Sequence, residues 1–330
     1  MMRLKYQFLQ IPILLLSSLL IIVGCQKKDY AIPDPVSTLS NDCIKRTLGP
    51  NIVSLPIDFA YAMAIPKSKG KLVSAQVEAS IAGATGTFLQ NNSYYTNSSG
   101  VDVPVPVGTP SVNKDNLTTV TFNVDTNAAT LRYTYIVPEE ARGKTVSFTF
   151  SATSSDGATV SYKMGPYTIS KMDIKRTMTV SNGNLAYISI ADMAVYNSTD
   201  AAANAAKIDL VYLYRATPSA FTHALVSPAA DAQYLPGITL PAGVNRSTKI
   251  RKVFNLQDYN LARINVGIFI DDKDFQEINF ADAPNYAIGL KAEAGTWVET
   301  ADGKYRAYIF LNSINSNGSA VISMLRYPLQ

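Results

Sequence analysis

The sequence predicts an all-β protein made of two tandem antiparallel β-sandwich domains, immunoglobulin-like or jelly-roll-like, with one short helix in the second domain. Apolar residues alternate with polar or hydroxyl residues in many short segments, a pattern typical of strands with one buried and one solvated face. Turn residues such as Gly, Pro and Asp-Gly separate these segments. We find no internal repeat of 20–50 residues and no heptad pattern.

The first sandwich is expected over residues 41–172. Residues 145–152 show the alternation most clearly, with apolar side chains at the even positions and hydroxyls at the odd positions. Asp156-Gly157 predicts a tight hairpin. Residues 91–117 contain three prolines and are expected to form a long exposed loop of the kind that binds ligands. Strands are predicted at 52–65, 71–81, 84–90, 119–124, 131–137, 144–154 and 159–164.

The second sandwich is expected over residues 173–330. A capping residue, Ser198, and an Ala-rich stretch predict a short helix over 198–206. Residues 216–248 are rich in Pro and Ala and are expected to be irregular. Strands are predicted at 185–196, 207–215, 250–256, 261–270, 286–292, 295–300, 304–312 and 319–327.

The amino terminus has the pattern of a lipoprotein signal. Arg3 and Lys5 precede an apolar run at residues 11–23, shorter than the roughly 20 residues that span a bilayer. The run ends in Gly24 and Cys25, and this resembles the bacterial lipobox. We therefore expect a signal peptide over 1–24, a lipid on Cys25 and a tether over 25–40. An ordinary secretory signal with an incidental cysteine is the alternative.

The residues after Cys25 bear on location. Gln26 and Lys27, followed by Asp29, resemble the surface-export signal of Bacteroidetes lipoproteins. The resemblance implies outer-membrane, cell-surface display with the lipid anchor as the membrane contact, and a periplasm-facing anchor is the alternative. Lipidation leaves Cys43 without a disulfide partner, and we expect it to be buried near the start of the first domain.

Composition argues against several function classes. The chain has 29 basic and 25 acidic residues, and removal of residues 1–24 with their two basic residues leaves 27 against 25, or +2. So small an excess of positive charge gives no electrostatic field that would attract nucleic acid. With one His and two Cys, no zinc set, other metal site or cofactor is expected. His223 is interpreted as structural, since no nucleophile motif accompanies it. The acidic cluster at 271–274 could hold calcium, but a solvated turn is favoured.

The hairpin around Asp302-Gly303 is the main candidate for sugar binding. A two-residue loop would place Trp297 opposite Tyr308. The same register would place Glu299 opposite Arg306. All four side chains would then share one face, and rings beside a carboxylate and a guanidinium suit a sugar.

Two alternatives apply to this hairpin. A three-residue loop over 301–303 would change the pairing, so that Trp297 faces Ala307 and Glu299 faces Tyr305. In either register, Trp297 could instead pack in the core, with the charged residues forming a weak surface ion pair.

Tyr94 and Tyr95 are the second candidate for sugar binding. They lie in a polar part of the predicted loop, and adjacent tyrosines on a loop cannot both bury easily. One ring is therefore expected as an exposed platform, and a ring that anchors the loop is the alternative.

The lipobox, the Gln-Lys tether and two β-rich domains together resemble the accessory surface lipoproteins of gut Bacteroidetes. Residues 208–215 (IDLVYLYR) and 297–305 (WVETADGKY) are similar to an uncharacterised lipoprotein family of that phylum. The resemblance implies a non-catalytic glycan-binding accessory protein of a polysaccharide-uptake system, with a polysaccharide ligand and an outer-membrane importer as partners. A structural, adhesive or partner-docking lipoprotein of fimbrial type is the alternative, and a hydrolase is the third hypothesis.

Overall fold

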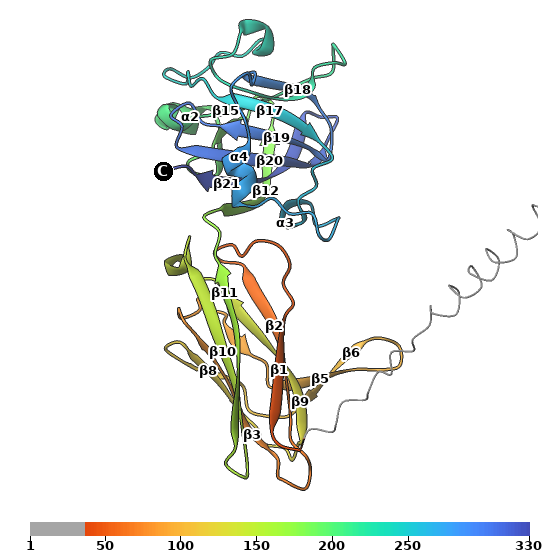
Figure 1. Ribbon diagram of the computed structural model, residues 1–330. Helices are drawn as coiled ribbons and strands as arrows, with labels where there is room; N and C mark the ends of the chain where they lie inside the picture. Colours follow the sequence, from red (N-terminus) through yellow and green to blue (C-terminus); the bar gives the residue numbers. More distant parts are fainter. Residues whose placement is uncertain (1–36) are drawn as a thin grey trace, which may run out of the picture. The chain divides into compact units, whose positions relative to one another are not determined.

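The first domain is a sandwich of two antiparallel sheets, shown in Figure 1 by a computed structural model that describes residues 37–330. The prediction of an all-β sandwich fold is confirmed. One sheet has the strand order β1 (Ser40–Lys45), β2 (Pro56–Ala64), β9 (Ala128–Ile136) and β4 (Phe88–Leu89). The other has the order β11 (Thr159–Thr168), β10 (Thr145–Ser154), β3 (Leu72–Ala79), β8 (Leu117–Thr121) and β7 (Val112–Lys114).

The alternation in the sequence becomes an alternation of burial in the strands. Every even-numbered residue of β10 is buried. Phe59 of β2 lies opposite Tyr133 of β9, and its ring lies 4.8 Å from that of Phe148 in the other sheet. Such aromatic pairs contribute about 0.5–1.5 kcal/mol each beyond the burial of their area. The hairpin predicted at Asp156-Gly157 does join β10 to β11.

The second domain also contains two antiparallel sheets, whose facing sides enclose a core that includes Leu210, Ile250 and Ile322. One sheet has the order β12 (Asp173–Ser181), β21 (Ser319–Pro328), β20 (Tyr305–Ile314), β19 (Ala294–Glu299) and β17 (Lys249–Phe254). The other has the order β14 (Ala194–Tyr196), β13 (Tyr187–Ser189), β15 (Leu210–Arg215), β16 (Thr222–Val226) and β18 (Tyr286–Leu290).

The outer face of the sheet that contains β19 and β20 is covered by a second apolar layer. This layer includes two short helices, α3 (Tyr259–Ala262) and α4 (Asp272–Glu277). Phe275 of α4 belongs to one buried cluster with Trp297 of β19 and Tyr308 of β20. Because β20 is buried on both faces, five consecutive residues in it are buried.

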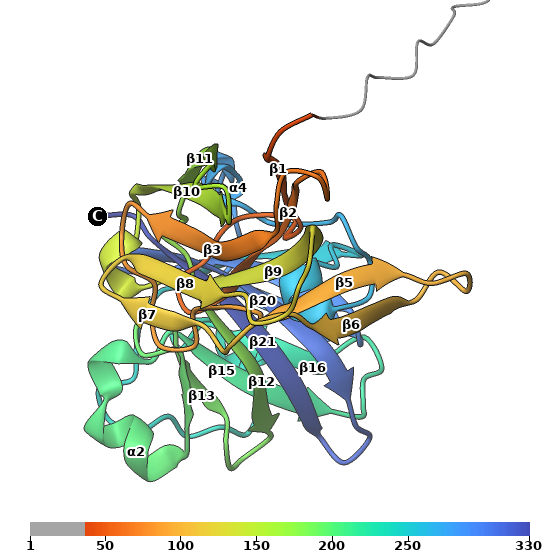
Figure 2. The same ribbon diagram turned by 90° about the horizontal axis from the view of Figure 1, so that it is seen from below.

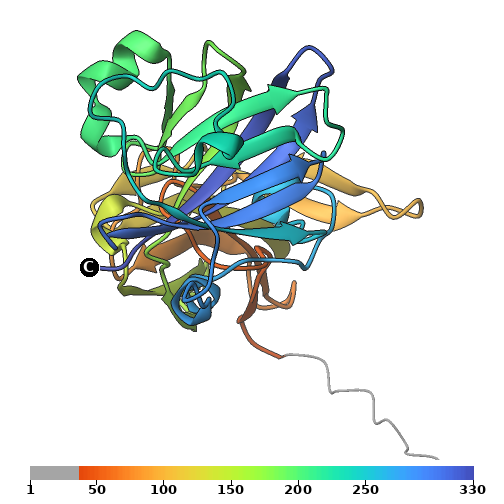
Figure 3. The same cartoon turned by 90° about the horizontal axis from the view of Figure 1, so that it is seen from above.

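The other sheet has a cover of its own. Helix α2 (Ser198–Ala203) lies outside the sheet (Figure 3). Ala201 of α2 and Val244 of the connection after β16 belong to one buried cluster with Val211 of β15. The predicted helix over 198–206 is thus confirmed, since α2 is followed by the 3₁₀ turn η2 (Ala205–Lys207). The expectation of a single helix in this domain is wrong, because α3 and α4 are also present.

The prediction of a long loop over 91–117 is wrong. This segment contains a two-stranded hairpin, β5 (Asn92–Thr96) and β6 (Asp102–Pro106), followed by β7. The hairpin projects from the domain in Figure 2. Pro104 and Pro106 lie in β6, whose only strand partner is β5, and a proline without an N–H group is tolerated on such an edge.

Three further expectations from the sequence are corrected. Residues 261–270 form the end of α3 and a loop rather than a strand, and residues 222–226 form β16 within a segment expected to be irregular. No strand was predicted before residue 52, and residues 40–45, at the start of the predicted first domain, form the edge strand β1. The described chain also includes two other 3₁₀ turns, η1 (Glu139–Ala141) and η3 (Ala232–Tyr234).

Hydrogen bonds and ion pairs fix the connection between the two domains. The Ser170 hydroxyl donates to the Asp272 carboxylate of α4, and the backbone N–H of Lys171 donates to the same carboxylate at 3.1 Å. Arg142 of the first domain pairs with Asp173, the first residue of β12, at 2.8 Å. Residues Thr38–Gln330 accordingly form one compact unit.

Candidate functional site

The four hairpin residues predicted to bind sugar do lie on one face of the β19–β20 hairpin. Trp297 pairs with Tyr308, and Glu299 pairs with Arg306, as predicted for a two-residue loop. Five residues, 300–304, separate the two strands, so the register was predicted correctly but the loop is longer. The register of the three-residue alternative does not occur.

That face is buried, which corrects the interpretation of these residues as a sugar platform. Trp297 is 5% exposed and Tyr308 is fully buried. The ring of Trp297 lies 5.1 Å from that of Phe275, which is part of the cover that the sequence did not predict. The alternative of a core Trp297 is therefore the correct one.

The charged pair of the hairpin also has a structural role. Glu299 and Arg306 form an ion pair at 2.9 Å, and each side chain is less than one-fifth exposed. The Nη1 atom of Arg306 donates to the carbonyls of Phe275 and Gln276 at 2.5 and 3.1 Å. Arg306 thus satisfies carbonyl groups at the C-terminal end of α4.

Tyr94 and Tyr95 lie on β5 and point to opposite faces of the hairpin. The guanidinium carbon of Arg132 lies 3.7 Å from the centre of the Tyr94 ring, and the Tyr94 hydroxyl donates to Gln90. Tyr94 therefore anchors the hairpin on β9. Tyr95 is 56% exposed and is the only ring of the two that is open to a ligand.

The predicted lipidation site, Cys25, lies outside the described residues, as do the signal peptide and most of the tether. Cys43 in β1 is buried and free, as expected, and burial raises the pKa of its thiol to about 12. Such a thiol is chemically inert at neutral pH. Among residues 37–330, no helix has the length and hydrophobicity needed to cross a bilayer.

The acidic cluster at 271–274 begins α4 and is not a solvated turn. Asp271 accepts hydrogen bonds from the backbone of Lys273 and Asp274 at 2.8 and 3.2 Å, and Asp274 accepts one from the backbone of Asp271 at 2.9 Å. This is a capping box, which satisfies N–H groups at the helix start. Across residues 37–330, no group of three or more His, Cys, Asp and Glu side chains is arranged to hold a metal ion.

His223 is buried in β16. Its Nδ1 atom lies 2.6 Å from the hydroxyl oxygen of Tyr212, and burial lowers the pKa of the imidazole. A neutral, hydrogen-bonded imidazole inside the domain agrees with the structural interpretation.

A groove that the sequence did not predict lies beside the connection between the domains. Two adjoining cavities of about 510 and 420 Å³ form it, and Pro50 and Phe269 line both of them. Ligand pockets typically measure about 300–1,000 Å³. The loop between β1 and β2 forms one wall, and residues 259–273 form the other. We call these two cavities together the junction groove.

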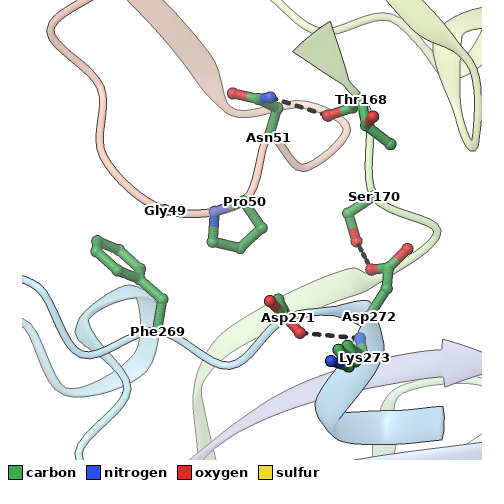
Figure 4. A pocket seen from close by; sticks show the side chains of 9 residues that line it. All are labelled: Gly49, Pro50, Asn51, Thr168, Ser170, Phe269, Asp271, Asp272 and Lys273. Carbon is green, nitrogen blue, oxygen red and sulfur yellow. Dashed lines mark hydrogen bonds between the residues drawn. The ribbon is translucent and has the colours of Figure 1, made fainter.

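Polar side chains lie beside Pro50 and Phe269 at the larger end of the junction groove (Figure 4). The side-chain Nδ2 of Asn51 donates to the carbonyl of Thr168 at 2.9 Å, which fixes the orientation of the amide. The Oδ1 atom of Asn51 is buried and has no hydrogen-bond partner among the described residues. Buried acceptors without partners are uncommon, so this oxygen lacks a hydrogen bond that such a group usually makes.

Phe269 and Gly49 meet where the two ends of the groove join. Gly49 has a φ of +75°, a conformation that favours glycine. A side chain on Gly49 would overlap the ring of Phe269. Glycine is therefore required here for its backbone conformation and for the close approach of the ring.

The smaller end combines aromatic and basic side chains. The rings of Tyr259 and Phe269 are both half-buried, and their centres lie 5.8 Å apart at an interplanar angle of 74°. Arg46, Arg176 and Arg263 line the same cavity. This end therefore offers apolar ring surface and guanidinium donors side by side.

A buried carboxylate holds the wall that carries these rings. Asp258 is fully buried and caps α3, with its side chain accepting hydrogen bonds from the backbone of Leu261 at 3.1 Å and of Ile270 at 2.6 Å. Burial raises the pKa of this carboxyl to about 6. The bond to Ile270 ties the end of the loop from 263 to 269 to the start of α3.

Comparisons with known proteins cover both domains. Residues 36–169 match a domain of unknown function, DUF4466, and residues 170–329 match another, DUF8576. The crystal structure of a DUF4466 family protein from Parabacteroides merdae is 50% identical in sequence, with a TM-score of 0.85 over 89% of this chain and 100% of that chain. No curated protein matches.

Proposed function

The chain belongs to the DUF4466 family, whose description assigns no activity, and we propose from its own surface chemistry that it is a non-catalytic glycan-binding protein. We further propose that it is a lipoprotein displayed at the outer-membrane surface and that it serves a polysaccharide-uptake system. The junction groove is the observation that carries the proposal.

Its chemistry matches that of a sugar. Sugar rings have apolar C–H faces, which pack on aromatic rings, and hydroxyl groups, which need hydrogen-bond partners. Tyr259 and Phe269 supply half-buried rings, and the free Oδ1 of Asn51 supplies an acceptor. Two adjoining cavities of this size suit consecutive units of an extended chain.

The carboxylates in the groove support binding rather than catalysis. Hydrolysis of a glycoside needs a carboxyl pair free to act as acid and base or nucleophile. Asp271 caps α4, Asp272 accepts from Ser170, and Asp58 accepts from the hydroxyl of Thr134 at 2.7 Å. Each is already engaged in holding the fold.

The lipid on Cys25 is proposed from the signal pattern described above. An outer-membrane importer is the partner this role would require. The fimbrial alternative would require a strand that can be exchanged between subunits. β21 lies between β12 and β20 inside its sheet, which counts against exchange of the carboxyl-terminal strand.

Affinity electrophoresis against a panel of plant and host polysaccharides tests the proposal. We expect at least one polysaccharide to retard the protein, without release of reducing ends. Gly49→Ala should reduce this retardation, because the new methyl group displaces Phe269 from the groove.

Gly100→Ala is the matched control, since Gly100 has the same φ of +75° but no atom within 4 Å of the added methyl. Tyr95→Ala tests the exposed ring of the β5–β6 hairpin and should leave retardation unchanged. The proposal fails if no polysaccharide retards the protein, or if Gly49→Ala and Gly100→Ala behave alike.

A further inference from the structure

The residues that line the smaller end of the junction groove carry more positive than negative charge. Arg46 follows β1, Arg176 lies in β12, and Arg263 follows α3, so three separate segments each bring one guanidinium to a single cavity of about 420 Å³. Among the described residues that line this cavity, Asp58 is the only acidic one, which gives three positive charges against one negative charge, or +2. The buried carboxylate of Asp258, outside the lining, also attracts Arg176.

These arginines differ from most others in the described chain. Among residues 37–330, none of the three forms a salt bridge. Five other arginines are paired with carboxylates: Arg132, Arg142, Arg246, Arg306 and Arg326. The unpaired guanidinium groups thus converge on a cavity, where an anion from outside can reach them.

The arrangement is held in place although it is electrostatically unfavourable. The Nε atom of Arg176 donates to the carbonyl of Asn260 at 2.5 Å, which orients the guanidinium and leaves its Nη groups available. Burial and the like charge of Arg263 lower the pKa of Arg176, and the nearby Asp258 carboxylate offsets only part of this. Arg263 itself has a φ of +56°, where glycine is the favoured residue at a helix end. A bound anion would relieve the repulsion between these two guanidinium groups.

Resting on the glycan-binding function proposed above, we propose that the junction groove selects acidic glycans and that the three arginines bind an oxyanion on the sugar, either a uronate carboxylate or a sulfate ester. Guanidinium groups bind both through paired hydrogen bonds. The adjoining rings of Tyr259 and Phe269 provide the surface for the sugar ring that carries the charge. Asn260, whose backbone carbonyl orients Arg176, lines the same cavity.

The test uses the full chain in detergent and two pairs of polymers that differ only in charge. Polygalacturonate is compared with its methyl ester, and dextran sulfate with dextran. We expect the charged member of at least one pair to retard the protein at about tenfold lower concentration than the neutral member. Preference within the first pair identifies a uronate as the anion, and preference within the second identifies a sulfate.

Two variants locate the selectivity. Arg176→Gln and Arg263→Gly should each lose about tenfold in retardation by the charged polymer, with retardation by the neutral polymer unchanged. Arg263→Gly removes an unfavourable backbone conformation, so its thermal stability should not fall and a loss of binding cannot be ascribed to unfolding. Arg215→Gln, an exposed arginine outside the groove, makes the same charge change and should have no effect.

The outcomes separate this inference from the proposed function. If no polymer in these pairs or in the wider panel retards the protein, glycan binding itself is refuted. If charged and neutral polymers retard it equally, glycan binding stands and acid selectivity is refuted. Selectivity that survives both groove variants, or is lost equally in Arg215→Gln, also refutes the assignment to the three arginines.

Discussion

Replacing Trp297 by alanine removes the only tryptophan of the chain from a closed aromatic cluster. Its ring lies 5.1 Å from that of Phe275 and 4.9 Å from that of Tyr308, and its side chain faces the cover formed by α3 and α4. The substitution therefore opens a cavity between the sheet and this cover. The expected effect is a loss of stability of the second domain, not the loss of a ligand contact.

The expected size of this loss in stability follows from the burial of Trp297. Trp297 is 5% exposed, and truncation of such a residue to alanine costs about 3–5 kcal/mol. A domain is stable by about 5–15 kcal/mol, so the variant should lose a large part of its free energy of unfolding. Trp297→Phe should lose less, because a second aromatic ring keeps most of the contact with Phe275. Tyr95→Ala, at a residue that is 56% exposed, should stay within about 0.5 kcal/mol of the wild type.

Urea denaturation followed by circular dichroism measures these differences. In the wild-type protein, fluorescence from the single tryptophan reports on this domain directly and should be shielded from acrylamide until unfolding. A Trp297→Ala variant whose free energy of unfolding stays within about 0.5 kcal/mol of the wild-type value would refute a structural role for Trp297. A variant that keeps its stability but loses glycan retardation would restore Trp297 as a ligand contact.

Asp258 has a folded-state pKa of about 6 and an unfolded-state value near 3.9, so its contribution to stability is present below about pH 4 and is lost as the pH rises through 6. Urea titrations should therefore show that the free energy of unfolding of the wild type falls by up to about 3 kcal/mol between pH 4 and pH 7, relative to that of Asp258→Asn. Parallel pH profiles of the two proteins would contradict this. Arg246→Met should lower the free energy of unfolding by about 3–5 kcal/mol in urea denaturation, because it leaves Asp209 as an unpaired buried charge. The Asp209 side chain is 1% exposed and lies 2.8 Å from Arg246. An unchanged denaturation midpoint would show that Asp209 is already neutral. Cys25→Ser should release the protein from membranes of the native host in cell fractionation, and continued membrane association would argue against a lipid anchor on this residue.

The strands were largely predictable because alternation with period two is a local property of the chain. The pattern at 145–152 predicts one buried and one solvated face, and β10 has that pattern. The register of the β19–β20 hairpin was predicted in the same way, since a short loop restricts which residues can face each other. Errors arose in segments without clear alternation, such as 261–270, and in the proline-containing strand β6.

The candidate site could not be predicted, and its residues show why. Arg46, Arg176 and Arg263 are separated by 130 and 87 positions and share no local motif. Gly49 has the positive φ of many turn glycines, and only the ring of Phe269 against it distinguishes it from Gly100.

The fold class, most of the strands and the pairing within hairpins follow from the amino-acid sequence, because each depends on neighbours along the chain. The burial of Trp297 and the meeting of three distant arginines at one cavity follow from the folded structure alone. Which distant segment covers a given face depends on long-range packing, and a pattern within one strand shows that a face is apolar without showing what lies against it.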